Sequence, residues 1–128
     1  MVTQMSLKTP CGHKTTVTAE KVGKVTKIHL DTTCPNLTKW GIDFELDKKD
    51  LLHIHNDVFM EKYKNATPSA NCYTPATVMM AAWVENGLLA ASLAKEAGKI
   101  EITFDKIKEK KVDSNGVDLT KINKKLSL

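Results

Sequence analysis

Three cysteines and a histidine are the residues of this 128-residue chain whose types and spacing could do chemistry together. Cys11 and His13 are separated only by Gly12, in the stretch TPCGHKTTV, where the chain is about to enter a predicted strand. In an extended segment, residues i and i+2 point to the same face. The pair could therefore be half of a metal site, a reactive thiol with its base, or a chance spacing.

The other two cysteines share a local setting. Cys34 and Cys72 each lie just before or at a predicted helix start that contains a proline, Pro35 in one case and Pro75 in the other. Backbone N–H groups and the helix dipole favour an anion at such a position, which lowers the pKa of a thiol. We therefore expect thiolates there, the form that binds a metal or attacks an electrophile.

A predicted hairpin would bring two of the cysteines together. Residues 14–22 and 25–31 are rich in Thr and Val or alternate in polarity, and Gly23 and Lys24 between them suit a tight turn. In a hairpin the start of the first strand lies beside the end of the second, so Cys11 and Cys34 should be neighbours. Cys72 can join them if the helix that follows it packs on this sheet.

Three thiolates and one nitrogen would suit a tetrahedral Zn²⁺ site or an iron–sulfur cluster. His13 is the first choice for the nitrogen, and His55 is the second because it borders the apolar face of a predicted middle helix. The competing interpretation is that the three cysteines fill the core, since free Cys is often buried and no CxxC pair is present. His29 and His53 are expected to face solvent.

The remaining pattern predicts mainly helices. One helix starts at Pro35 and ends at Gly41, and apolar residues recur at helical spacing between residues 47 and 66. A helix that is apolar nearly all round precedes Glu85 and should be buried, with a further helical stretch up to Gly98. Residues 99–104 alternate as a final strand. The fold class predicted is α+β, an antiparallel hairpin or sheet packed against helices, with Met79, Met80 and Trp83 in the core.

Length and charge indicate one domain with a basic tail. The predicted domain covers residues 1–105, and residues 106–128 form a Lys-rich tail with a turn signal at 114–116. The net charge is +4, and every basic residue is Lys. Because bidentate reading of guanine or phosphate favours Arg, sequence-specific nucleic-acid binding is not expected.

No segment has the character of a signal peptide or a membrane span. The first ten residues contain no continuous apolar core, and the longest uncharged run, 65–84, is interrupted by prolines and polar residues. We therefore expect a cytoplasmic protein. Its three cysteines should be reduced there, and their odd number argues further against a closed disulfide framework.

The order of these features resembles the U-type iron–sulfur cluster scaffold proteins. In that family a Cys-Gly-Asp opens a strand, a second Cys follows at a helix start, and a third Cys precedes a long buried helix. Cys11-Gly12-His13 matches the first element with His in place of Asp, Cys34 matches the second and Cys72 the third. The resemblance covers residues 9 to about 90. In the scaffold family the third Cys is usually preceded by His, whereas Asn71 stands at that position here. The chain also resembles small archaeal and bacterial proteins that share the three-cysteine pattern.

The resemblance implies that Cys11, Cys34 and Cys72 hold an iron–sulfur cluster, or zinc in its place, with His13 as fourth ligand and Gly12 allowing close backbone approach. The protein would then receive, store or transfer the cluster, with a sulfur donor and apo-protein acceptors as partners. Two alternatives stay open. Cys72 could be a nucleophile or sulfur carrier with Cys34 as resolving thiol, or zinc could be purely structural.

Overall fold

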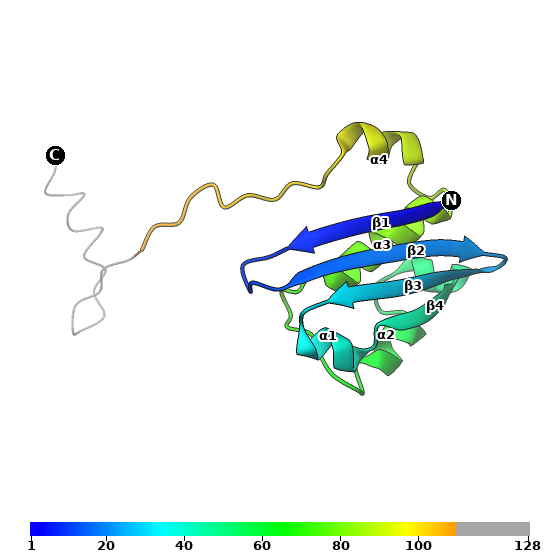
Figure 1. Cartoon of the computed structure of the whole chain (residues 1–128), viewed down its shortest axis with the longest axis horizontal. Coiled ribbons are helices and arrows are strands. Elements are labelled where there is room, and N and C mark those ends of the chain that lie inside the picture. The colour runs from blue at the N-terminus through cyan, green and yellow to red at the C-terminus, as the bar shows by residue number, and fades with distance from the viewer. Residues whose placement is uncertain (110–128) are drawn as a thin grey trace, which may run out of the picture. The chain divides into compact units, whose positions relative to one another are not determined.

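The computed structural model describes residues 1–109. Met1–Gly98 form one compact unit, and the described residues from Lys99 onward are not part of it. This unit contains all helices and strands of the described residues, so the predicted α+β class is confirmed. Its four strands are β1 (Val2–Lys8), β2 (Lys14–Val22), β3 (Val25–Thr32) and β4 (Asp43–Asp47). They form one antiparallel meander in the order β1-β2-β3-β4 (Figure 1).

The predicted hairpin is the centre of this sheet. β2 and β3 pair in the register Val17↔Leu30 and Ala19↔Ile28, and Gly23 turns the chain with a φ of 64°. Because side chains alternate along a strand, the odd residues of β2 and the even residues of β3 share one buried face. The other face of the sheet is open to solvent.

Two strands were not predicted from the sequence. β1 carries Gln4, Ser6 and Lys8 on its exposed face and only half-buried residues on the other, and β4 is the acidic stretch DFELD. Neither segment has the β-branched composition that favours a strand, so pairing with β2 and β3 fixes both of them.

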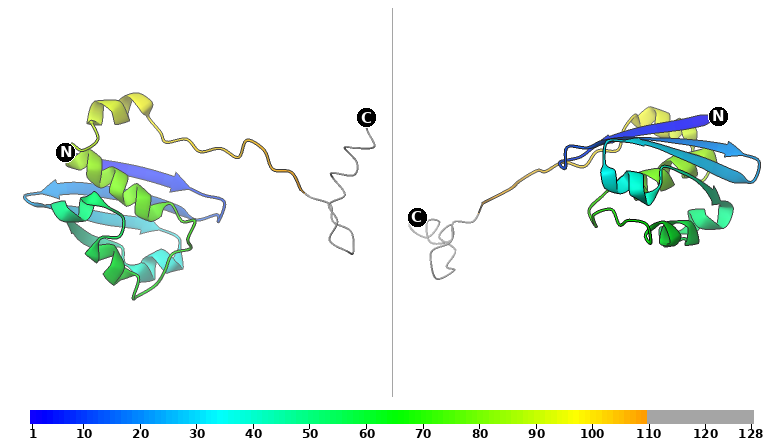
Figure 2. Two further views of the ribbon diagram at one scale, coloured as in Figure 1. Left: turned by 180° about the vertical axis from the view of Figure 1, so that it is seen from behind. Right: turned by 60° about the horizontal axis from the view of Figure 1, so that its bottom comes forward.

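Most of the helices cover one face of the sheet, whereas α4 lies beyond its β1 edge and has no buried residue (Figure 2). They are α1 (Pro35–Trp40), the 3₁₀ helix η1 (Lys48–Leu52), α2 (Asp57–Lys62), α3 (Thr74–Glu85) and α4 (Ala91–Ala97). α3 packs mainly against β1 and β2. The core between the layers is a cluster of buried apolar side chains: Val17, Ala19, Ile28, Leu30, Leu37, Trp40, Leu46, Leu51, Phe59, Val78, Ala81 and Ala82.

Three details differ from the sequence prediction. The helical pattern of residues 47–66 is divided into η1 and α2, because His53 is extended and Asn56 caps a new helix by accepting a bond from the Phe59 N–H at 2.8 Å. Trp83 is 38% exposed rather than a core residue, and it donates from Nε1 to the Leu51 carbonyl at 2.7 Å. Met80 is half-buried rather than in the core, whereas Met79 packs against the core as predicted.

The predicted strand at 99–104 is wrong for the described residues. This segment belongs to no sheet, because its backbone groups have no ladder partner there. The predicted turn at 114–116 lies outside the described residues. No helix in residues 1–109 is long and apolar enough to cross a membrane.

Candidate functional site

Cys11 lies in a turn between β1 and β2, not on a strand. The Gly12 N–H donates to the Thr9 carbonyl at 3.0 Å, and Gly12 has a φ of 85°. This positive φ breaks the strand alternation, so the expectation that Cys11 and His13 share a strand face is wrong. A Cβ at Gly12 would meet no atom within 4 Å. In this structure Gly12 therefore supplies a backbone conformation rather than room for close approach.

The Cys11 thiol is exposed and has a polar neighbour. Its Sγ lies 3.0 Å from the Thr9 Oγ1. This hydroxyl, followed by the backbone of His13, lowers the pKa of Cys11 below its ordinary value. A hydrogen bond to the charged form stabilises that form, so the thiolate population of Cys11 is raised at neutral pH.

His13 joins this turn to the end of β3. Its Nδ1 lies 3.0 Å from the Thr33 Oγ1, and the Lys14 N–H donates to the same oxygen at 3.2 Å. The Thr33 N–H donates in turn to the Lys14 carbonyl at 3.2 Å. His13 is half-buried, and its Nδ1 contacts Thr33, the residue before Cys34. The Nε2 of His13 takes no part in this contact.

Cys34 is the N-cap residue of α1, as predicted. Its backbone N–H donates to the Thr32 Oγ1 at 3.1 Å, and its side chain makes no capping bond. The half-buried thiol packs against the hydrophobic core. The Sγ of Cys34 therefore makes no bond that stabilises the helix, and it remains available as a metal ligand.

Cys72 lies two residues before α3. Its N–H donates to the Ser69 carbonyl at 2.9 Å, and its half-buried side chain also packs against the core. The pKa of Tyr63 is raised by burial and, second, by the charge of Cys72. The Tyr63 hydroxyl therefore lies within electrostatic reach of the Cys72 thiol.

The direction of α3 decides where Cys72 lies. Glu85, at the C-terminal end of α3, accepts bonds from Thr3 Oγ1 at 2.6 Å and from the Lys21 N–H at 3.2 Å. These partners belong to the start of β1 and the end of β2. A 12-residue helix is roughly 18 Å long, about the span of five or six strand residues. The N-terminal end of α3, and Cys72 with it, therefore lies toward the opposite end of the sheet, where Cys11 and Cys34 are.

All three cysteines are free thiols at this end of the sheet. Among residues 1–109, however, no three His, Cys, Asp or Glu side chains are close enough together to hold a metal ion. Three thiols suit a soft metal or a cluster in their chemistry. The three thiols do not form an assembled coordination shell among the described residues, and Cys11 is the exposed member of the three.

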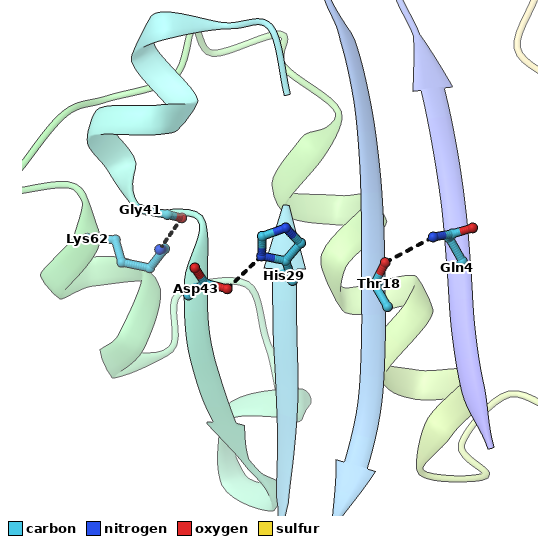
Figure 3. A network of polar contacts seen from close by, with 6 residues as sticks. All are labelled: Gln4, Thr18, His29, Gly41, Asp43 and Lys62. Carbon is cyan, nitrogen blue, oxygen red and sulfur yellow. Dashed lines mark hydrogen bonds and ion pairs between the residues drawn. The ribbon is translucent and has the colours of Figure 1, made fainter. Parts of the chain in front are cut away.

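The other histidines are separate from this group. His55 is exposed in the turn before α2 rather than partly buried in a helix, so the second-choice nitrogen does not border an apolar helix face. His29 is exposed as predicted, and its Nδ1 contacts Asp43 Oδ1 at 2.6 Å on the open face of the sheet (Figure 3). His53 is exposed, again as predicted.

The buried residue Lys62 was not predicted from the sequence. Lys62 is 8% exposed, and its Nζ donates to the Gly41 carbonyl at 2.8 Å (Figure 3). The Nζ also lies 4.2 Å from the Trp40 ring centroid and 3.7 Å from that of Phe44. A Cβ at Gly41 would come within 2.8 Å of this Nζ, so Gly41 gives the amine room.

Burial lowers the pKa of Lys62 to about 8, and the charge of Asp43 opposes this shift. Nothing in the sequence distinguishes Lys62 from the eighteen other lysines. The single weak signal is Gly41, because a glycine can mark a close approach as well as a helix end. Beside the amine, Trp40 Nε1 is buried and has no hydrogen-bond partner among the described residues.

The fold and the site define an α+β protein with three free thiols at one end of a four-stranded antiparallel sheet. The chain belongs to the DUF6951 family, a family of unknown function, whose model matches residues 7–97. That range includes all three cysteines, both hairpin strands and the four α-helices. Neither the curated proteins nor the solved structures contain a match to the chain.

Proposed function

We propose that this protein binds an iron–sulfur cluster, or a soft metal ion such as zinc, as cargo, and passes it on as a scaffold or carrier. Cys11, Cys34 and Cys72 would hold the cargo. The observation that carries this proposal is the placement of three free thiols, distant in sequence, at one end of the sheet. Thiolates are the preferred protein ligands for such clusters and for zinc.

The arrangement favours transferable cargo over a structural zinc ion. A structural zinc site is closed by four ligands in fixed tetrahedral positions. Residues 1–109 hold no such set, and the fold is built around a hydrophobic core instead. One exposed thiol and two half-buried thiols suit a site that assembles when the cargo arrives and opens when it leaves.

The remaining parts of the proposal rest on the resemblance to U-type scaffold proteins. His13 would supply a fourth ligand through Nε2, since its Nδ1 is bonded to Thr33. The partners would be a sulfur donor and apo-protein acceptors. A reducing compartment such as the cytoplasm would keep the three thiols free.

A second candidate function is thiol chemistry at Cys11. Because Cys11 is exposed and its pKa is lowered, we expect this cysteine, rather than Cys72, to be the nucleophile that reacts first or the sulfur carrier. This candidate needs no metal. The Cys11 thiolate would attack the outer sulfur of a donor persulfide and release the donor's thiolate, or attack a disulfide and release one of its two thiolates, and the modification is expected at Cys11 only.

The test is the metal and acid-labile sulfide content of the full chain purified without oxygen, together with its visible spectrum. The cargo proposal expects iron with sulfide, or zinc, bound in a fixed ratio to protein. Cys11→Ser, Cys34→Ser and Cys72→Ser should each lose most of it, and His53→Ala is the matched control that should keep it.

The outcomes separate the two candidates. Full loading in any one of the three serine variants would contradict the three-thiol site. Protein that binds neither metal after anaerobic reconstitution, yet forms a persulfide on Cys11, would replace the cargo proposal with the thiol-carrier function.

A further inference from the structure

The segment 99–105, with the sequence KIEITFD, has two chemically different sides. Ile100, Ile102 and Phe104 are 60%, 71% and 76% exposed, although all three are strongly apolar. They alternate with Lys99, Glu101, Thr103 and Asp105. This period of two is the pattern of a strand with one face meant for burial.

The polar side of the segment is already organised. Lys99 Nζ lies 3.5 Å from Glu101 Oε1, and Thr103 Oγ1 donates to Asp105 Oδ1 at 2.7 Å. Both contacts join residues two apart, as happens when such side chains lie on one face of an extended backbone. The segment therefore has the side-chain arrangement of a strand without being paired as one.

The backbone of the segment has no ladder partner among the described residues. Its composition of Ile, Thr and Phe, with no Gly or Pro inside, is typical of paired strands. Exposed apolar residues on an unpaired strand-like segment form a template for pairing with another chain.

We propose that segment 99–105 pairs with the same segment of a second copy of this chain, antiparallel and centred on Ile102. In this register Ile102 faces the partner's Ile102, and Ile100 faces the partner's Phe104. All the apolar side chains then lie on one face of the ribbon. The proposal concerns assembly and is independent of the cysteine site.

Charge complementarity favours a second copy of this chain as the partner and favours antiparallel over parallel pairing. The antiparallel register places Lys99 opposite the partner's Asp105, twice by symmetry, and Glu101 opposite the partner's Thr103. Parallel in-register pairing would instead oppose Lys99, Glu101 and Asp105 each to the same residue of the partner. Like charges directly opposite each other destabilise a strand pair, whereas opposite charges stabilise it. A two-fold axis at Ile102 closes the assembly at two chains.

The test is the mass of the full chain by sedimentation equilibrium under reducing conditions, from about 10 µM to about 1 mM, because a two-stranded ribbon alone is a weak interface. The wild type is expected to form dimers in this range. Lys99→Asp and Asp105→Lys should each weaken dimerisation about tenfold by opposing like charges. The double variant Lys99→Asp/Asp105→Lys should restore it, and Lys24→Asp, in the β2–β3 turn, should leave it unchanged.

Several results would overturn the proposal. These are a wild type that stays monomeric at the highest concentration, a double variant no better than the single ones, and single variants that dimerise like the wild type. Open-ended growth into fibres would also overturn it, since the proposed pair closes on itself. Lys99 and Asp105 are both exposed, so these substitutions remove no buried side chain.

Discussion

Cys11 is distinguished from the other two cysteines by a single hydroxyl. The Thr9 Oγ1 is the largest cause of its lowered pKa, and the side chain is exposed on a turn. The thiol that is most accessible is thus also the one with a hydrogen-bond partner for its thiolate. Reactivity at this end of the sheet should therefore begin at Cys11.

Replacing Thr9 with Val tests this interpretation at the level of one residue. Thr9→Val removes the hydroxyl, so the pKa of Cys11 should rise and alkylation by iodoacetamide near pH 7 should slow severalfold. Above pH 10 the wild type and the variant should react at the same rate, because both thiols are then ionised. Peptide mapping follows each cysteine separately, with Cys34 and Cys72 as internal controls. Equal rates at pH 7 would show that Thr9 has no effect.

Lys62 gives a prediction about pH and stability. Its pKa is about 8 in the folded protein, below the ordinary value of 10.5 for a free lysine. Between these values the unfolded chain binds more protons than the folded one, so the free energy of unfolding should rise with pH. Below pH 8 the lysine is protonated in both states and contributes no slope.

The variant Lys62→Met should lack this pH-dependent contribution to the free energy of unfolding. Urea unfolding of both proteins at intervals from pH 7 to pH 10 isolates it, because every other titrating group is shared. Lys64→Met, at an exposed position, is the matched control. If the difference between wild type and Lys62→Met does not change with pH, the amine is solvated rather than enclosed by Trp40 and Phe44.

At the scale of elements, one carboxylate fixes the orientation of α3. Glu85 links this helix to the start of β1 and to the end of β2, and it is buried. Glu85→Ala removes both bonds and leaves the Lys21 N–H without its partner, so it should destabilise the protein by about 1–3 kcal/mol.

The control for this prediction is Glu96→Ala, at an exposed position of α4, which should change stability by less than about 0.5 kcal/mol. Chemical denaturation compares the two variants with the wild type. A Glu85→Ala variant as stable as Glu96→Ala would mean that apolar packing alone holds α3 in place.

Elements with strong local signals were predictable from the sequence. Thr and Val content located β2, the Gly23 turn located the hairpin, and Pro35 and Gly41 bounded α1. β1, β4 and the break at His53 were missed, because neighbouring strands and the Asn56 cap fix them rather than their own composition. The final strand at 99–104 was predicted from alternation alone, which cannot supply a pairing partner.

At the scale of the whole molecule, the two ends of the sheet differ. One end carries the three cysteines and the other carries the Gly23 turn. Hairpin geometry predicted that the segment after Cys11 lies beside the end of β3, and the contact of His13 with Thr33 agrees with this. The placement of Cys72 depends on the direction of α3, which contacts with residues more than sixty positions away determine. Sequence pattern carries no information about such contacts.

Loading with cargo should therefore affect one end only. If the proposed cargo binds at the three cysteines, hydrogen exchange should slow at the amides of the Thr9–Gly12 turn when iron and sulfide, or zinc, are added, because Cys11 on that turn would become a ligand. The Gly23–Lys24 turn is the internal control and should exchange at the same rate in both states. Mass spectrometry of peptic peptides measures both, and equal slowing at the two ends would indicate general stabilisation instead of a site.

The meander order has a consequence for how the chain folds. Each strand pairs with its neighbour in sequence, so the sheet can form from local contacts within the first 47 residues, and local contacts form quickly. The helix that covers β1 and β2, however, begins only at Thr74. During synthesis the apolar face of the newly formed sheet stays exposed to solvent until α3 has left the ribosome. In that interval the chain is most prone to aggregate and to bind chaperones.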